Sequence, residues 1–225
     1  MLHSLKKAAL LGCFIPSMAF AQDQQKTEFI QQYFDRESEH AELWQNGWFG
    51  LFAGVATLQG IAYTQTENEP NLTDRAVGFT TSFLGAADLL LNPLNTHKYA
   101  EQLAAMPDDS EAQQTAKRQQ AERWLEAVAK REAYEQSWVN HLLSGLVNGI
   151  AGAVVANEGD RTGKGVATFI SGVVASELKI YTAPQNAEKA LQQYRQGNYS
   201  LTAISEPQRW QFAAVGPVFH ASYRF

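Results

Sequence analysis

Cysteine is almost missing from this chain. The only cysteine among the 225 residues is Cys13, which lies in an apolar stretch near the start. If that stretch is removed, no thiol remains for a disulfide or for a metal site built on cysteine. We therefore expect the fold to be stabilised by its own apolar core or by a membrane.

Residues 1–21 have the composition of a secretory signal peptide. Lys6-Lys7 precede an apolar segment from Ala8 to Met18, and a small-x-small cleavage site ends at Ala21. A lipoprotein signal anchored at Cys13 is the minor alternative, because Leu10-Leu11-Gly12-Cys13 resembles a lipobox. Both interpretations predict export to the periplasm or to a membrane of the cell envelope.

Basic residues are too few for a nucleic-acid-binding protein. The chain has 18 Lys and Arg against 23 Asp and Glu, and its formal net charge is −5. Removing residues 1–21 takes away two lysines and no acid, which gives 16 − 23 = −7. Proteins that bind nucleic acids usually present a basic face, so we predict no such partner.

Motifs for catalysis and for metal binding are also lacking. The histidines His40, His97, His141 and His220 are scattered and show no metal-ligand spacing. No Gly-x-Ser-x-Gly elbow and no phosphate-binding loop is present. We predict no catalytic residue, no metal and no cofactor, and we favour a protein that is not an enzyme.

Two long segments contain no charged residue. They are Leu43–Thr66 and Gln136–Asn157, and either one is long enough to cross the hydrocarbon core of a bilayer as a helix. A short polar loop follows each segment and leads to a second apolar segment, Ala76–Pro93 or Gly165–Thr182. This pattern predicts two helical hairpins.

The two hairpins belong to a repeated unit. Four short motifs occur once in each half: Trp44-Gln45-Asn46 and Trp138-Val139-Asn140, Gly50/Gly54 and Gly145/Gly149, Asp74-Arg75 and Asp160-Arg161, Pro93-x-Asn95 and Pro184-x-Asn186. A duplicated unit strongly constrains the architecture. The prediction is a mainly α protein of two pseudo-symmetric repeats, residues 22–106 and 107–195, in which the Gly-x-x-x-Gly pairs pack helices together.

Each repeat also contains an amphipathic helix before the hairpin and a short helix after it. Apolar spacing indicates the amphipathic helices at about 24–44 and 109–137. The short helices are expected at about 96–105 and 187–195. Residues 196–225 lie outside the repeat and predict a short C-terminal β-hairpin, with strands Trp210–Val215 and Val218–Phe225.

One carboxylate interrupts the second apolar segment of each hairpin. Asp88 follows Arg75 at the same spacing as Glu177 follows Lys164, so the two acids occupy equivalent positions along the second helix of their hairpins. The antiparallel course of each hairpin brings polar residues of the preceding helix near that level. Asp88, Glu177, Asn46, Asn140 and His141 are thus candidates for binding an ion or a ligand, although each acid can also face water or bind a neighbour.

The apolar segments allow two interpretations. Small residues at four-residue spacing and tryptophans at segment starts favour helices in lipid. The alternative is a soluble helical bundle, which is favoured by the distribution of basic residues because they lie mostly on the exported side. The membrane interpretation predicts a lipid or membrane partner, with a homo-oligomer or an envelope protein as further candidates.

The segment from about residue 120 to 195 resembles uncharacterised exported or membrane-associated bacterial proteins. The resemblance rests on Ser137-Trp138-x-x-His141-Leu142 and on Tyr181-Thr182-x-Pro184. It implies a bacterial cell-envelope protein and no catalytic residues. We therefore expect a non-enzymatic envelope protein that associates with the membrane through its Gly-rich hairpins. The alternative is a periplasmic protein that binds a lipid or another apolar ligand between its halves.

Overall fold

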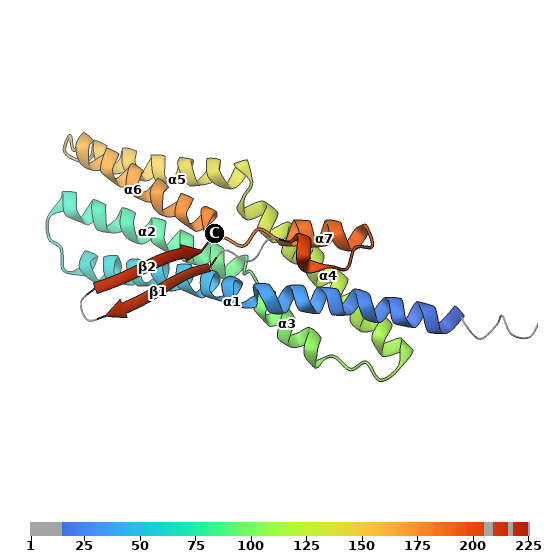
Figure 1. Ribbon diagram of the computed structural model, residues 1–225. Helices are drawn as coiled ribbons and strands as arrows, with labels where there is room; N and C mark the ends of the chain where they lie inside the picture. The colour runs from blue at the N-terminus through green and yellow to red at the C-terminus, as the bar shows by residue number, and fades with distance from the viewer. Residues whose placement is uncertain (1–14, 205–208, 216–217, 225) are drawn as a thin grey trace, which may run out of the picture.

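The structure, a computed structural model, describes residues 15–204, 209–215 and 218–224 (Figure 1). This part of the chain is mainly helical, as predicted. Its helices are α1 (Ile15–Thr64), α2 (Glu69–Leu91), α3 (Thr96–Ala105), α4 (Glu111–Glu135), α5 (Trp138–Asn157), α6 (Thr162–Tyr181) and α7 (Ala187–Arg195), followed by a short 3-10 turn at Leu201–Ala203. Most of the predicted signal peptide, residues 1–14, lies outside the described residues.

Helix α1 is a single helix of 50 residues. The predicted amphipathic helix and the first uncharged segment are continuous, because neither proline nor a strong cap interrupts them. The corresponding junction in the second half is broken at Ser137, which caps α5 by accepting a hydrogen bond from Asn140 N at 3.3 Å. Leu43 precedes Trp44 where Ser137 precedes Trp138, so the first half lacks the hydroxyl that starts a new helix.

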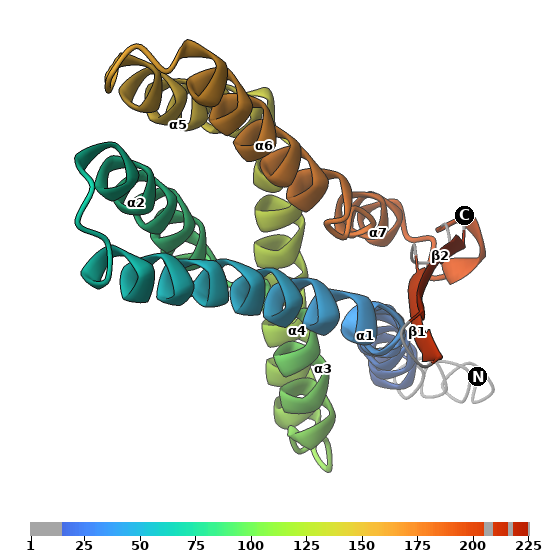
Figure 2. The same ribbon diagram turned by 90° about the vertical axis from the view of Figure 1, so that its left-hand side faces the viewer.

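The second part of α1 forms a hairpin with α2, and α5 forms a hairpin with α6. Both hairpins extend towards the same end of the molecule (Figure 1). Seen from that end, they are two separate helix pairs, and α4 crosses behind them (Figure 2). We call this pair of hairpins the arms and the turns at their ends the tips.

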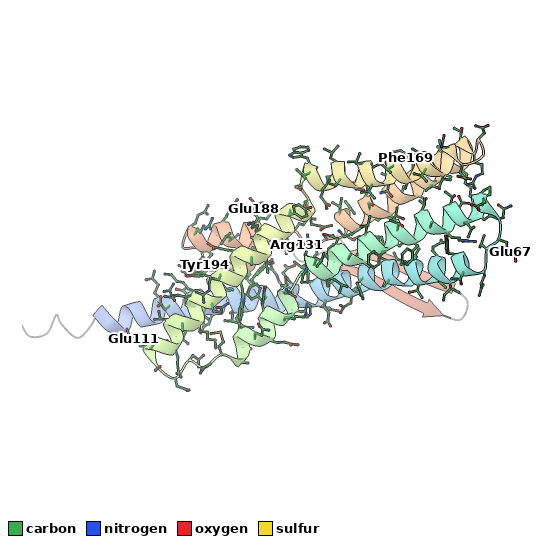
Figure 3. The ribbon with its side chains drawn as sticks, turned by 180° about the vertical axis from the view of Figure 1, so that it is seen from behind. Glu67, Glu111, Arg131, Phe169, Glu188 and Tyr194 are labelled. Atoms are coloured by element: carbon green, nitrogen blue, oxygen red, sulfur yellow. The ribbon has the colours of Figure 1, made fainter. Side chains whose placement is uncertain are left out.

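The other end of the molecule, here called the base, consists of the first part of α1 with α3, α4 and α7. Its helices, together with Leu89 of α2, pack a continuous apolar core. The largest fully buried apolar members are Tyr33, Phe34, Ile30, Leu89, Leu103 and Leu125. Helix α4 begins with a capping box in which Ser110 and Gln113 bond each other's backbone N–H. Figure 3 shows Glu111 and Tyr194 at this end and Glu67 at the tips.

Two strands follow the helices. Strand β1 (Arg209–Val215) pairs antiparallel with β2 (Val218–Arg224), and the register runs from Arg209 opposite Arg224 to Val215 opposite Val218. The residues between the strands, 216–217, and the last residue lie outside the described part of the chain.

Candidate functional site

Asp88 of the first hairpin binds a lysine of the second. Its Oδ2 atom lies 3.2 Å from Lys179 Nζ of α6, and its Oδ1 atom accepts a hydrogen bond from Asn92 Nδ2 at 3.1 Å. A carboxylate in an apolar helix must be paired, hydrated or neutralised. At Asp88 the structure shows pairing, across the boundary between the two hairpins.

Lys179 is the centre of a buried ionic network. Its ammonium group lies 2.5 Å from Glu135 Oε1, and Arg131 Nη1 lies 2.6 Å from the other oxygen of the same carboxylate. Lys179 is 7% exposed and Glu135 is 2% exposed. Trp44 encloses the lysine, with the ring centroid 5.6 Å from Nζ and the indole N–H donating to Lys179 O. This network connects α6 with α4 and α1 where the arms join the base.

Lys179, Glu135 and Arg131 were not among the residues predicted to form a site. Lys179 does leave a trace in the sequence, because a charge inside an otherwise apolar helix requires a partner. Glu135 and Arg131 leave none, since α4 is rich in charges and only the packing distinguishes these two from the rest.

Glu177 binds His141, and the pair lies on the surface. His141 Nδ1 is 2.9 Å from Glu177 Oε2, and each side chain is 44% exposed. The structure therefore places the two equivalent acids with different partners, Lys179 for Asp88 and His141 for Glu177.

The two asparagines have separate environments. Asn140 donates through Nδ2 to Glu135 O at 2.7 Å and so closes the turn between α4 and α5. Asn46 is exposed, and its neighbour Gln45 makes the buried contacts instead. Gln45 donates to Leu89 O at 2.8 Å and accepts from Leu94 N at 2.9 Å. Four of the five predicted residues thus take part in two ion pairs and a turn contact, and Asn46 lies on the surface, so the five do not line one common pocket.

Two further carboxylates lie inside the base. Glu37 and Glu132 are both buried, and Glu37 Oε1 accepts a hydrogen bond from Asn186 Nδ2 at 3.1 Å. Glu132 Oε2 accepts one from Ala187 N at 2.8 Å. The pKa of Glu132 is raised to about 8. Burial is the largest cause and raises it, the hydrogen bond from Ala187 N lowers it, and the nearby charge of Glu37 raises it. Glu132 is therefore largely protonated at neutral pH.

The predicted helix-packing glycines do not pack helices within the described chain. A Cβ placed on Gly50, Gly54, Gly145 or Gly149 would meet no other atom within 4 Å. The close approaches involve other glycines. A Cβ on Gly152 would lie 2.7 Å from Gly165 O and 2.8 Å from Phe169 Cβ. The spacing alone could not distinguish the two groups, because contact depends on how each helix is rotated towards its neighbour.

Replacing Gly152 with valine is expected to destabilise the second hairpin by about 1–3 kcal/mol, because the side chain must force α5 and α6 apart. Thermal unfolding of the purified protein measures the effect. Gly149→Val is the matched control, since it adds the same groups to the same helix where nothing lies within 4 Å. Equal losses in the two variants would contradict the assigned contact.

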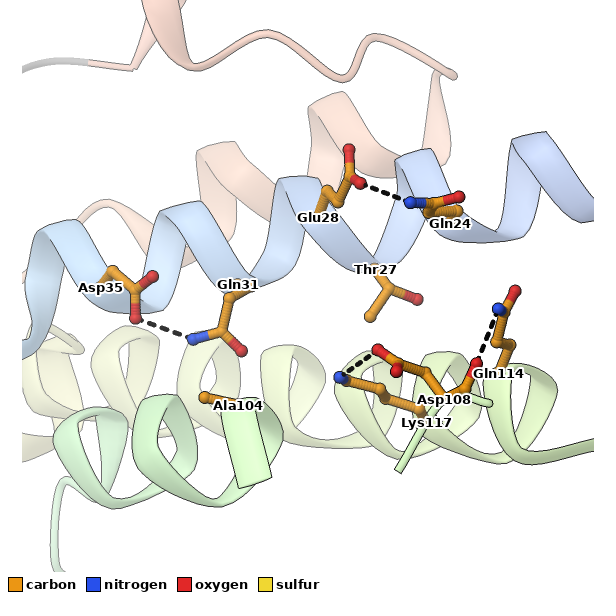
Figure 4. Close-up of a pocket in the computed structure, with 9 residues that line it drawn as sticks. All are labelled: Gln24, Thr27, Glu28, Gln31, Asp35, Ala104, Asp108, Gln114 and Lys117. Atoms are coloured by element: carbon orange, nitrogen blue, oxygen red, sulfur yellow. Dashed lines mark hydrogen bonds and ion pairs between the residues drawn. The ribbon is translucent and has the colours of Figure 1, made fainter. Parts of the chain in front are cut away.

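A polar cavity of about 390 Å³ lies in the base between α1, α3 and α4 (Figure 4). Its polar side chains largely bind one another: Gln24 with Glu28, Gln31 with Asp35, and Lys117 with Asp108. No large apolar side chain is among its lining residues. The cavity therefore gives no support to the alternative of an apolar ligand bound between the halves.

The described residues contain no group of three or more His, Cys, Asp or Glu side chains that could hold a metal ion. They contain one helix, Trp138–Asn157, that is long and apolar enough to cross a membrane by length and composition.

Comparison with known proteins found no protein family, no curated protein and no solved structure that matches the chain.

Proposed function

We propose that this protein is a non-enzymatic protein of the bacterial cell envelope that associates with a membrane through its two helical hairpins. The observation that carries the proposal is the position of the exposed apolar side chains. Most of the large ones lie on the arms: Leu51, Leu58, Ile61 and Tyr63 on α1; Phe79, Phe83, Leu84, Leu90 and Leu91 on α2; Trp138, Leu142, Leu146, Ile150 and Val154 on α5; Val166, Phe169, Ile170, Val174 and Leu178 on α6.

This surface is costly in water. On α5, the side chains of Leu142, Leu146 and Ile150 lie about one turn apart and each is more than half exposed. Full removal of one such side chain from water is favourable by about 1.5–3 kcal/mol of free energy. Soluble monomers rarely expose large continuous apolar surfaces, so contact with lipid accounts for the composition of the arms.

Ion pairs connect the two hairpins at both ends. At the tips, Arg161 lies 2.9 Å from Asp74 of α2 and also donates to Pro70 O, and Lys164 contacts the same aspartate. At the base, Lys179 and Asp88 make the equivalent connection. These contacts support the insertion of both hairpins as one four-helix unit.

Within this proposal, the chain consists of two pseudo-symmetric repeats and a C-terminal β-hairpin tail. The arrangement of the short helices supports the repeats: Asn95 precedes α3 and Asn186 precedes α7, each as the N-cap residue of a Pro-x-Asn motif. The pairing of β1 with β2 supports the tail. The predicted signal peptide supports export and hence a position in the envelope.

Membrane fractionation of the expressed protein tests the proposal. The protein is expected to sediment with membranes and to remain there after a carbonate wash, because the arms remove their apolar side chains from water in the bilayer. A protein that is released by carbonate and remains monodisperse without detergent would contradict it.

Charges placed on the exposed face of α5 are expected to weaken this association. Changing Leu146 and Ile150 together to glutamate adds two carboxylates to a lipid-facing surface, at about 2.5–3.5 kcal/mol each. Most of the double variant should move to the soluble fraction. The control is Lys98→Glu/Lys189→Glu, which changes two exposed residues of the base and should leave sedimentation unchanged. If both double variants sediment like the unmodified protein, α5 is not in contact with lipid.

A further inference from the structure

Charged groups bound the uncharged part of the arms on both sides, although the exposed Leu90, Leu91 and Leu178 lie just beyond them. At the tips these are Asp74 with Arg161 and Lys164. Where the arms join the base they are Asp88 with Lys179, and Glu177 with His141. No charged residue lies between Arg75 and Asp88 on α2 or between Lys164 and Glu177 on α6, and α1 and α5 have none along the arms.

The height of this uncharged band follows from helix geometry. The segment between the charges is 76–87 on α2 and 165–176 on α6. With a rise of about 1.5 Å per residue, each segment extends about 18 Å along its helix. Phe83 on α2 and Ile170 on α6 lie within it and are exposed. The hydrocarbon core of a typical bilayer is about 30 Å thick, so the band is distinctly shorter.

The base-side edge of the band cannot move deeper into lipid without cost. Glu177 and His141 point outward rather than into the protein, with 44% of each side chain exposed. Ionisable groups that face lipid cost several kcal/mol near the centre of a bilayer and little at its surface. One turn beyond this pair, Trp138 is 72% and Tyr181 is 59% exposed. Tryptophan and tyrosine are enriched at the level of lipid headgroups.

The edge of the band at the tips is formed by long basic side chains. Lys164 is half exposed, and Arg75 is exposed and donates to Gln59 Oε1 at 3.1 Å. Long basic side chains can reach a headgroup layer a few ångströms away. This adjustment lengthens the usable band at one end only.

From these limits, and resting on the proposed membrane function, we infer that the arms fit a bilayer whose hydrocarbon core is thinner than the typical one, about 20 Å. The partner is thus a phospholipid membrane with short acyl chains or with a thickness reduced around the protein. Trp138, His141, Glu177 and Tyr181 lie at its headgroup layer on the base side.

Flotation with vesicles of different thickness tests this inference. The protein, purified from membranes in detergent, is mixed with dimyristoleoyl, dioleoyl or dierucoyl phosphatidylcholine, and the detergent is removed. We expect roughly fivefold or more protein in the short-chain than in the long-chain vesicles, because hydrophobic mismatch disfavours the thicker bilayer. Equal or better recovery with the long-chain lipid would overturn the inference. Absence from all three vesicle types would instead contradict the membrane function itself.

A pair of double variants links the preference to the named edge. His141→Leu/Glu177→Leu removes the exposed ion pair and extends the apolar band of the second hairpin by about one turn, so the short-chain preference should fall by about half. His141→Gln/Glu177→Gln is the control, since it removes the charges but keeps polar side chains at this edge. It should retain the preference. If the leucine variant keeps the preference in full while circular dichroism shows an unchanged helical content, these residues do not define the edge.

Discussion

Replacing Lys179 with methionine is expected to lower the free energy of unfolding by about 3 kcal/mol. The substitution keeps the length of the side chain but removes the ammonium group that lies 2.5 Å from Glu135 and 3.2 Å from Asp88. Removing one partner of a buried ion pair costs about 3–5 kcal/mol, because the remaining charge stays out of water. The lower value applies here, since Arg131 still binds Glu135.

Denaturant or thermal unfolding of the purified protein, followed by circular dichroism, measures this loss. Lys189→Met is the matched control, because Lys189 is exposed on α7 and the change removes the same charge. A second readout is the indole fluorescence of Trp44, whose ring lies beside the ammonium group. If Lys179→Met unfolds at the same denaturant concentration as the control, the network does not stabilise the fold.

The second large effect is a dependence of stability on pH that arises from Glu132. Its pKa in the folded protein is about 8, against an ordinary value near 4.5. Between these two values the folded protein holds a proton that the unfolded chain releases, so the contribution of Glu132 to stability falls as pH rises. The slope is about 1.4 kcal/mol per pH unit, and the fall is complete once pH exceeds the folded pKa.

Glu132→Gln should remove this dependence. Glutamine resembles the protonated acid, and its side-chain oxygen can still accept the hydrogen bond from Ala187 N. Between pH 5 and pH 8 the stability of the variant relative to the unmodified protein should therefore rise by roughly 3–4 kcal/mol. Glu101→Gln, at an exposed position on α3, serves as the control. Parallel pH profiles for the protein and the Glu132 variant would show that Glu132 is ionised in the fold.

The helix boundaries show how far local sequence predicts structure. Helices α3 and α7 begin and end as expected, because Pro93-x-Asn95 and Pro184-x-Asn186 determine their starts through local backbone geometry. The predicted division within α1 was wrong, since its two parts are one helix. The boundary between α4 and α5 depends on a single cap, Ser137, and the first half has no such residue.

The candidate site was predicted only in part. Hairpin geometry led us to expect polar residues of α5 near Glu177, and the structure places His141 beside that acid. It did not indicate that Asp88 binds a lysine of the other hairpin, because that contact depends on how the two hairpins lie relative to each other. For the same reason, glycine spacing did not indicate that Gly152 and Gly165, rather than Gly145 and Gly149, lie close to the neighbouring helix within the described chain.

The sequence by itself determined the helices, their turns and the two uncharged segments, because these depend on the spacing of apolar residues and on the backbone preferences of proline, serine and asparagine. Only the tertiary structure decided which charges are buried together and which apolar faces have no partner. Those properties depend on contacts between residues far apart in the chain, such as Glu135 with Lys179. Such contacts leave no local pattern, and they determine both the stability of the base and which apolar side chains of the arms stay exposed.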